Sequence, residues 1–375
     1  MNNNVKFLPI SFFSIVALVV LIDLSTSLFT KKSFLAFRAW ESMLSETGTT
    51  PFKPNSQFEQ LIHGDLANFL KVWEFRKLRH QRFSTDYYGY RNKNLSADTY
   101  YPIVVVGDSN MVGSSSSDEE IYSAQLSDII GVSVYNFAPN HPFDVLKTPR
   151  FAAQPPKVVI WDMTERLILS RKEGVEYAHV SRSLDPLTHS RSINLDLFLT
   201  QKLSQHYAQW AFGSAKWALF GLSQFTNAHV GFVSQDPLML FYAEGLSVMQ
   251  KNLDERGLLG SIEMITWVHR VMQKNGVTMI FLPIPDRENI YSHYLPEDSY
   301  LNRYGNQFLT ALAQGLTENQ VPNINLLAPF KEVADDELLY YFDDTHWNSS
   351  GIKLAADLTA EYLYKDLDLE ATLQK

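Results

Sequence analysis

A short, wholly apolar strand followed by a polar turn constrains the fold of this chain more than any other feature. Residues 103–106 are Ile followed by three Val, and Gly107, Asp108 and Ser109 come directly after them. Because this run has no alternation of apolar and polar residues, it predicts a parallel strand covered on both faces. Ligands of open α/β sheets bind at the carboxyl ends of strands, so Ser109 is a candidate nucleophile. The alternative interpretation is that Ser109 caps the helix that follows.

Apolar strand patterns alternate with helical patterns in most of the remaining sequence. Further strands are expected at 132–137, 158–161, 277–282 and 324–327, and helices at 119–130, 142–151, 257–274, 302–316 and 351–364. This alternation predicts right-handed crossovers and an α/β fold with a five-stranded parallel sheet. Residues 167–256 interrupt the pattern and are too long for a crossover, which predicts a large insertion. Extra helices packed on the sheet, a lid, or a docking surface for a membrane partner are the interpretations of this insertion.

The first part of the chain carries a different signal. Within residues 1–30, an apolar stretch at 7–29 has the length needed to cross a bilayer, with Asp23 near one end. We expect an uncleaved N-terminal transmembrane helix, and a cleaved signal peptide is the alternative. More basic residues follow the stretch than precede it, so the positive-inside rule weakly favours a cytoplasmic location for the rest of the chain.

Two regions separate this stretch from the serine strand. Residues 31–84 are expected to form a membrane-proximal helical region, in which the basic run 76–82 is a solvated helix face. The polar aromatic loop 85–92 either shapes the site or is a turn stacked on the sheet edge. The catalytic domain is then expected at 85–370, with the insertion inside it.

Composition excludes some classes of function. The net charge is −9 and no cluster of Lys and Arg stands out, which argues against nucleic-acid binding. There is no cysteine, so disulfides and thiolate metal sites are excluded. The ten histidines show no metal-ligand spacing, and the sequence suggests no metal or organic cofactor.

A second polar loop lies at 341–348, before the last expected helix. It contains Asp343, Asp344 and His346, and it follows the fifth expected strand, at the same edge of the sheet as Ser109. A serine hydroxyl needs a neighbouring base, and the base needs a carboxylate that orients it and stabilises the imidazolium. The two loops together therefore predict a Ser-His-Asp triad of Ser109, His346 and one of the two aspartates. The alternative for His346 is a core or helix-start histidine.

These motifs resemble those of the SGNH (GDSL-type) hydrolase superfamily, and the resemblance is closer to its bacterial alginate O-acetyltransferase AlgX/AlgJ-like branch. The shared features are Gly107-Asp108-Ser109 after a hydrophobic strand, Asn136 after the second strand, and the sequence Asp-Thr-His-Trp at 344–347. A Pro-x-Pro loop at 283–285 with a downstream tyrosine, Tyr291, also resembles relatives. The resemblance covers roughly residues 85–365 and implies a three-layer α/β/α sandwich. It favours Asp344 as the triad acid, with Asp343 as the alternative.

The sequence departs from the family pattern at three places. The Asp-x-His motif follows the serine, as in ordinary SGNH hydrolases, whereas it precedes the serine in the alginate enzymes. The glycine of the second block is replaced within 136–140, and the third block reads Asp-Met-Thr-Glu-Arg at 162–166. The oxyanion and substrate-binding candidates are therefore Asn136, Asn140, Arg166 and Trp347, beside the backbone N–H of Ser109.

The resemblance implies a serine-dependent O-acetyltransferase that modifies an exported cell-surface polysaccharide through an acyl-enzyme. Its acyl donor would be a membrane-bound O-acyltransferase, and the protein would be a single-pass protein of the bacterial inner membrane with a periplasmic catalytic domain. A carbohydrate esterase and a non-catalytic polysaccharide-binding or scaffold protein on the same fold are the alternatives. The altered second and third blocks and the many aromatic residues motivate the last of these.

Overall fold

A computed structural model provides the structure of the protein. It describes residues 4–29, 50–70, 73–92, 99–170, 233–235, 238–242, 255–295 and 304–374, with a few isolated residues between them. Most of the insertion expected at 167–256 lies outside the described residues.

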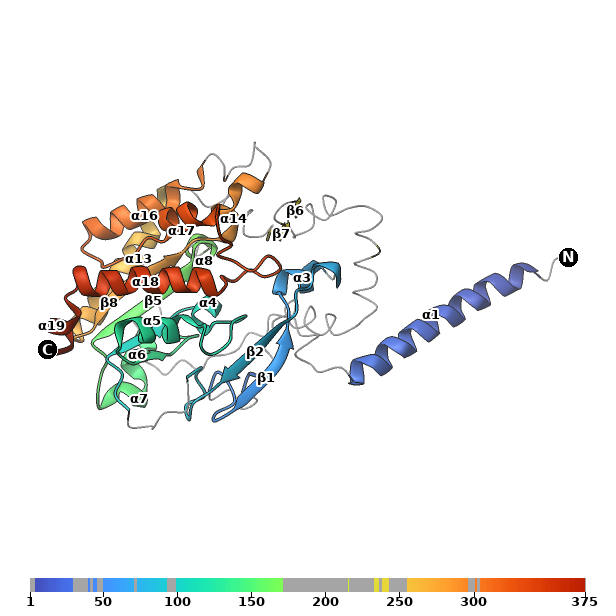
Figure 1. Ribbon diagram of the computed structural model, residues 1–375, viewed down its shortest axis with the longest axis horizontal. Coiled ribbons are helices and arrows are strands. Elements are labelled where there is room, and N and C mark those ends of the chain that lie inside the picture. Colours follow the sequence, from blue (N-terminus) through green and yellow to red (C-terminus); the bar gives the residue numbers. More distant parts are fainter. Residues whose placement is uncertain are drawn as a thin grey trace.

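A parallel sheet of four strands forms the centre of the protein (Figure 1). Its order is β4 (Val134–Asn136), β3 (Ile103–Val106), β5 (Val158–Thr164) and β8 (Thr278–Ile284). Every residue of β3, β4 and β5 is buried, as expected for strands covered on both faces. The chain moves outward from β3 to β4 in one direction and from β5 to β8 in the other. The topological switch point of this α/β sheet therefore lies between β3 and β5, where open sheets bind their ligands.

The expected fifth strand at 324–327 is wrong. A single parallel bridge joins Phe281 to Asn323, and α17 (Leu327–Ala334) begins directly afterwards. The side chain of Asn325 accepts a hydrogen bond from the backbone N–H of Leu327 at 3.0 Å and so forms a turn that leads into this helix, whose N-cap is Leu326. Such local bonds of asparagine compete with strand pairing, and here the helix start replaces the strand.

The expected helices of the domain are confirmed with shifted ends. The helix at the first crossover is α5 (Tyr122–Ile130), and the second crossover is two short helices, α6 (Pro142–Lys147) and α7 (Pro149–Ala152), because Pro149 starts a new helix. The third crossover ends in α13 (Glu255–Lys274), and α16 (Gln307–Glu318), α18 (Ser349–Lys365) and α19 (Leu369–Gln374) follow. Helix α18 packs on α5, and α13 packs on both α16 and β8.

The described part of the membrane-proximal region contains strands as well as helix. Strands β1 (Gln57–Ile62) and β2 (Arg79–Ser84) form an antiparallel hairpin, with α3 (Asp65–Leu70) and one turn of 3₁₀ helix (Trp73–Phe75) between them. The burial along β2 alternates, with Gln81 and Phe83 buried and Arg82 between them exposed. This period of two is the pattern of a half-buried strand. The helical interpretation of 58–79 is wrong for 58–62, which belong to β1, and is confirmed for 65–70 and 73–75.

Four further elements lie in the first part of the chain and in the insertion. Helix α1 spans Asn4–Phe29. Within the described residues, no helix combines the length and the apolar character that a membrane crossing requires, so the expected transmembrane helix is not confirmed. Of the insertion, α8 (Glu165–Ser170) opens it, and β6 (Val233–Gln235) pairs with β7 (Leu238–Leu240).

Candidate active site

Ser109 lies in the first turn after β3, at the switch point of the sheet. Gly107 has φ +145°, and a Cβ at this position would lie 1.3 Å from Oδ1 of Asp162, so no other residue fits. The N-cap of α4 (Ser109–Val112) is Asp108, whose side chain accepts a hydrogen bond from the N–H of Asn110 at 2.8 Å. Because Asp108 caps the helix, the alternative interpretation of Ser109 as the N-cap is wrong.

The structure brings the three residues of the expected triad together. Nε2 of His346 lies 2.8 Å from Oγ of Ser109, and Nδ1 of His346 lies 2.5 Å from Oδ1 of Asp344. His346 and Asp344 are almost completely buried, at 3% and 1% exposure, so water does not weaken the contact between them, whereas Ser109 is half-buried. This arrangement has the geometry of a nucleophile, a base and an orienting acid.

Asp344 is the aspartate that faces His346, whereas Asp343 faces the hairpin. The Asp343 carboxylate accepts hydrogen bonds from the N–H of Gly64 at 2.8 Å and from the N–H of Lys77 at 3.1 Å. Burial alone would raise the pKa of Asp344, but His346 and then Arg79 bring that pKa below its usual value. Asp344 is therefore held as a carboxylate beside the imidazole.

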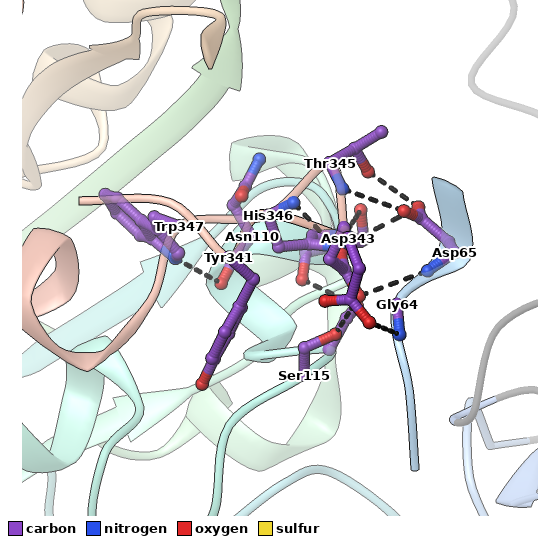
Figure 2. A network of polar contacts seen from close by, with 12 residues as sticks. Gly64, Asp65, Asn110, Ser115, Tyr341, Asp343, Thr345, His346 and Trp347 are labelled. Atoms are coloured by element: carbon purple, nitrogen blue, oxygen red, sulfur yellow. Dashed lines mark hydrogen bonds and ion pairs between the residues drawn. The ribbon is translucent and has the colours of Figure 1, made fainter. Parts of the chain in front are cut away.

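Two residues that contact the triad loop come from the hairpin region and were not found in the sequence. Asp65, at the start of α3, accepts hydrogen bonds from the N–H and the hydroxyl of Thr345 at 2.7 and 2.6 Å, and its Oδ2 lies 3.9 Å from Nδ1 of His346 (Figure 2). Arg79, on β2, forms ion pairs with both Asp343 and Asp344. The expected solvated helix face at 76–82 is therefore wrong for Arg79, which the strand turns inward.

The serine run at 114–117 also lies at the site. Oγ of Ser115 donates a 2.6 Å hydrogen bond to Oδ2 of Asp344. Arg91, which is fully buried, donates to backbone carbonyls of this loop at Val112, Gly113 and Ser116. Arg91 belongs to the polar aromatic loop 85–92, so that loop supports the backbone of the serine loop that contacts Asp344.

Three of the expected oxyanion or substrate residues have other contacts. The amide of Asn136 donates to the carbonyl of Met111 at 2.8 Å, and its oxygen accepts from the N–H of Ala138. The amide of Asn140 donates to the hydroxyl of Tyr90 at 2.9 Å and to the carbonyl of Phe137 at 2.8 Å. Trp347 is buried, lies parallel to the ring of Tyr122, and donates to the carbonyl of Asn110.

The fourth candidate, Arg166, belongs to a buried polar network at the ends of β5 and β8. It forms an ion pair with Asp286. Burial, followed by the charge of Asp286, raises the pKa of Glu165 to about 8. Burial and the nearby Asp108 raise the pKa of Asp162 well above its usual value. With a pKa of about 8, Glu165 is largely protonated at neutral pH, because burial disfavours its charged form.

The loop that carries Asp344 is also held by residues that follow β8. Arg287, which is fully buried, donates to the carbonyls of Tyr341, Phe342 and Asp344. Tyr291, the tyrosine downstream of the Pro-x-Pro loop, accepts a hydrogen bond from the N–H of Leu339 at 2.8 Å. The segment 283–291 therefore orients the loop.

One group among the described residues has the side-chain types of a metal site. Potential ligand atoms of Asp65, Asp344 and His346 lie within 4.8 Å of one another. The 2.5 Å separation of Nδ1 of His346 from Oδ1 of Asp344 is a hydrogen-bond distance, whereas two ligands of one metal ion each stand about 2 Å from it with the ion between them. We interpret the group as the acid and the base of the expected triad, with Asp65 as a neighbour that supports their loop.

Comparison with known families agrees with the motifs. Residues 238–375 match the family described as "SGNH hydrolase-like domain, acetyltransferase AlgX". The chain resembles the AlgX branch of the SGNH hydrolases. The matched part contains the loop with Asp344 and His346, and Ser109 lies before it. No curated protein matches the sequence.

Solved structures of low similarity include two mutants of an acetyl-xylooligosaccharide esterase from Geobacillus Stearmophilus. They share 12% and 11% identity with this chain, and their TM-scores are 0.35 and 0.34. Each alignment covers 69% of this chain and 92% of the esterase chain. An acetyl xylan esterase from the rumen bacterium Butyrivibrio proteoclasticus shares 11% identity, with 78% of this chain and 68% of that chain covered and a TM-score of 0.30. At these TM-scores nothing about the site follows from the similarity.

Proposed function

We propose that this protein is a serine-dependent O-acyltransferase that transfers an acetyl group to a sugar hydroxyl of an exported polysaccharide. The observation that carries the proposal is the continuous hydrogen-bond chain from Ser109 through His346 to Asp344, with distances of 2.8 and 2.5 Å. In this proposal Ser109 is the nucleophile, His346 is the general base and then the general acid, and Asp344 orients His346.

The first half of the reaction forms an acyl-enzyme. Nε2 of His346 takes the hydroxyl proton of Ser109 while Oγ bonds to the carbonyl carbon of the donor ester. His346 then gives that proton to the departing alcohol oxygen as the bond between the carbonyl carbon and this oxygen breaks. Asp344 stabilises the imidazolium that exists between the two proton transfers.

The second half transfers the acyl group to the acceptor. His346 takes a proton from the acceptor hydroxyl, whose oxygen attacks the carbonyl carbon of the acyl-enzyme. The proton then returns to Oγ of Ser109 as the ester bond breaks. A sugar hydroxyl as acceptor makes the protein a transferase, and water as acceptor makes it an esterase.

The negative oxygen of each tetrahedral intermediate requires hydrogen-bond donors. The backbone N–H of Ser109 is in the first turn of α4, where no helical carbonyl accepts it, and it is our first donor. Asn136 and Asn140 use their amides for the backbone and for Tyr90, so we assign neither of them to the oxyanion.

The donor and the location of the protein are proposed from the AlgX resemblance. We propose a membrane-bound O-acyltransferase as the source of the acetyl group and an extracytoplasmic catalytic domain. Fusion of a reporter that is active only in the cytoplasm to the C-terminus tests the location. An active reporter would contradict it.

The test of the function is an acetyl-ester assay of the full chain with and without oligosaccharide acceptors. We expect release of the alcohol from an activated acetyl ester, and acetylated oligosaccharide as a second product. Alcohol release with free acetate as the sole acyl product would show an esterase. No alcohol release, or equal release by Ser109→Ala, would contradict both activities and favour a non-catalytic carbohydrate-binding protein.

A further inference from the structure

A half-buried arginine from outside the two sequence motifs contacts the acid of the triad. Arg79 on β2 places Nη1 2.9 Å from Oδ1 of Asp343 and Nη2 3.0 Å from Oδ2 of Asp344. Its guanidinium lies 4.0 Å from the ring centroid of Tyr341. The side chains of the two aspartates are 0% and 2% exposed, and that of Arg79 is 14% exposed, so little solvent screens the pairs.

These contacts fix the carboxylate of Asp344 in one orientation. Oδ1 of Asp344 faces His346, and Oδ2 accepts from Arg79, from Ser115 and from the N–H of Asp65. Arg79 is the member of this set that carries a positive charge. A planar guanidinium that spans two carboxylates supplies direction as well as charge, which an ammonium group does not.

Arg79 also sets the balance of charge around His346. The imidazole is faced by Asp344 from its own loop, by Asp65 from α3 and by Ser109 from α4. The charged and titratable groups that surround Asp344 in turn are Asp65, Arg79, Tyr341, Asp343 and Arg287. Three carboxylates would overstabilise an imidazolium, because each nearby negative charge favours the protonated ring. Arg79 offsets part of this effect.

We propose that Arg79 is a positioning residue of the triad: it holds the Asp344 carboxylate against Nδ1 of His346, and its positive charge keeps His346 from becoming too basic, so that the imidazole is unprotonated at neutral pH. The proposal rests on the proposed function and deepens it, since it assigns a residue of the N-terminal hairpin to the acyl-transfer site. The hairpin 57–84 is then part of the catalytic unit.

The test compares pH profiles of kcat/KM for an activated acetyl ester in the full chain, with thermal unfolding measured in parallel. For Arg79→Gln we expect kcat/KM to fall about 100-fold and the acid limb of the profile to move up by about one pH unit, because one neutralising charge is lost. Arg79→Lys keeps the charge and loses the two-pronged geometry. We expect it to lower kcat/KM about 10-fold while its acid limb stays at the wild-type position.

Arg82→Gln is the matched control. Arg82 lies on the same strand but forms an exposed ion pair with Glu119, with both side chains about half exposed. We expect its profile to equal that of the wild type. An acid limb unchanged in Arg79→Gln would overturn the proposal, and so would an equal upward shift in Arg79→Lys. If Arg79→Gln does not fold, the position of the acid limb in Arg79→Lys decides. An inactive wild type would overturn the proposed function and this inference together. An active wild type with variants whose kcat/KM and acid limbs equal those of the wild type would overturn the inference alone.

Discussion

Replacement of Asp344 by Asn is the most informative change at the triad, because the surrounding donors dictate how the amide must turn. Oδ2 of Asp344 accepts from Arg79, Ser115 and the N–H of Asp65, whereas Oδ1 accepts from the backbone N–H and from Nδ1 of His346. The three donors at the Oδ2 position, one of them charged, favour an oxygen atom there more strongly than the two donors at the Oδ1 position. The asparagine oxygen therefore takes the Oδ2 position, and its NH₂ group faces Nδ1 of His346.

This orientation forces the wrong tautomer on the histidine. Nδ1 must then accept a hydrogen bond, so the ring proton moves to Nε2, which can no longer take the proton of Ser109. We expect kcat to fall by roughly 10³- to 10⁴-fold, which is about 4–5.5 kcal/mol of transition-state stabilisation. The assay is steady-state hydrolysis of an activated acetyl ester, with unfolding curves to show that the variant is folded.

Asp65 makes the experiment sharper, since it is a second carboxylate 3.9 Å from Nδ1 of His346. Its oxygens accept from Thr345, so it supports the loop and does not orient the ring directly. We expect Asp65→Asn to lower kcat less than 10-fold, roughly 1 kcal/mol for one weakened hydrogen bond. A large loss in Asp65→Asn together with a small loss in Asp344→Asn would refute the reasoning and make Asp65 the triad acid.

Three further predictions test other parts of the structure. Ser115→Ala removes one donor to Asp344, and we expect kcat/KM of the ester assay to fall about 3- to 10-fold, as for one hydrogen bond of roughly 1 kcal/mol to a charged group; an unchanged kcat/KM would contradict that role. Gly107→Ala places a Cβ against Asp162, so denaturant unfolding should show a loss of at least about 2 kcal/mol, and a loss under 0.5 kcal/mol would be inconsistent with the observed φ of +145°. The pKa of Glu165 is raised to about 8 in the folded protein, so this side chain keeps a proton that the unfolded chain releases at a lower pH. Its contribution to stability is therefore fully present at acid pH and is lost as pH rises toward 8. Glu165→Gln should flatten this decline in the free energy of unfolding measured between about pH 5 and pH 8.

The sequence predicts the central part of the fold because its strands are short and mostly apolar, and β3 is wholly so. The strand at 103–106 is found at the expected residues, and the strand expected at 158–161 continues to Thr164. The expected fifth strand does not form because the side chain of Asn325 bonds to the N–H of Leu327 and the chain turns into α17 despite the apolar residues around it. Strand β1 was not predicted because its apolar positions fit a helix as well as a half-buried strand, and only pairing with β2 decides between them.

The triad is predictable because two parallel-sheet loops must meet at one edge. Its supporting charges are not. Arg79 and Asp65 lie about 265 and 280 positions before their partners, at Asp344 and Thr345, and nothing in the local sequence marks them. The oxyanion candidates Asn136 and Asn140 also show why residue type is insufficient, since both amides are used to hold the backbone in the described structure.

The measurement that tests the central claim most directly is the trapping of the acyl-enzyme. The full chain is mixed with an activated acetyl ester, quenched in acid within the first turnover, digested and analysed by mass spectrometry. We expect one acetyl group on the peptide that contains Ser109 and none in Ser109→Ala. In His346→Gln the acetylated fraction should exceed that of the wild type only if the substitution slows deacylation more than acylation. An acetyl group on another residue with Ser109 unmodified, or equal acetylation of Ser109→Ala, would contradict the account.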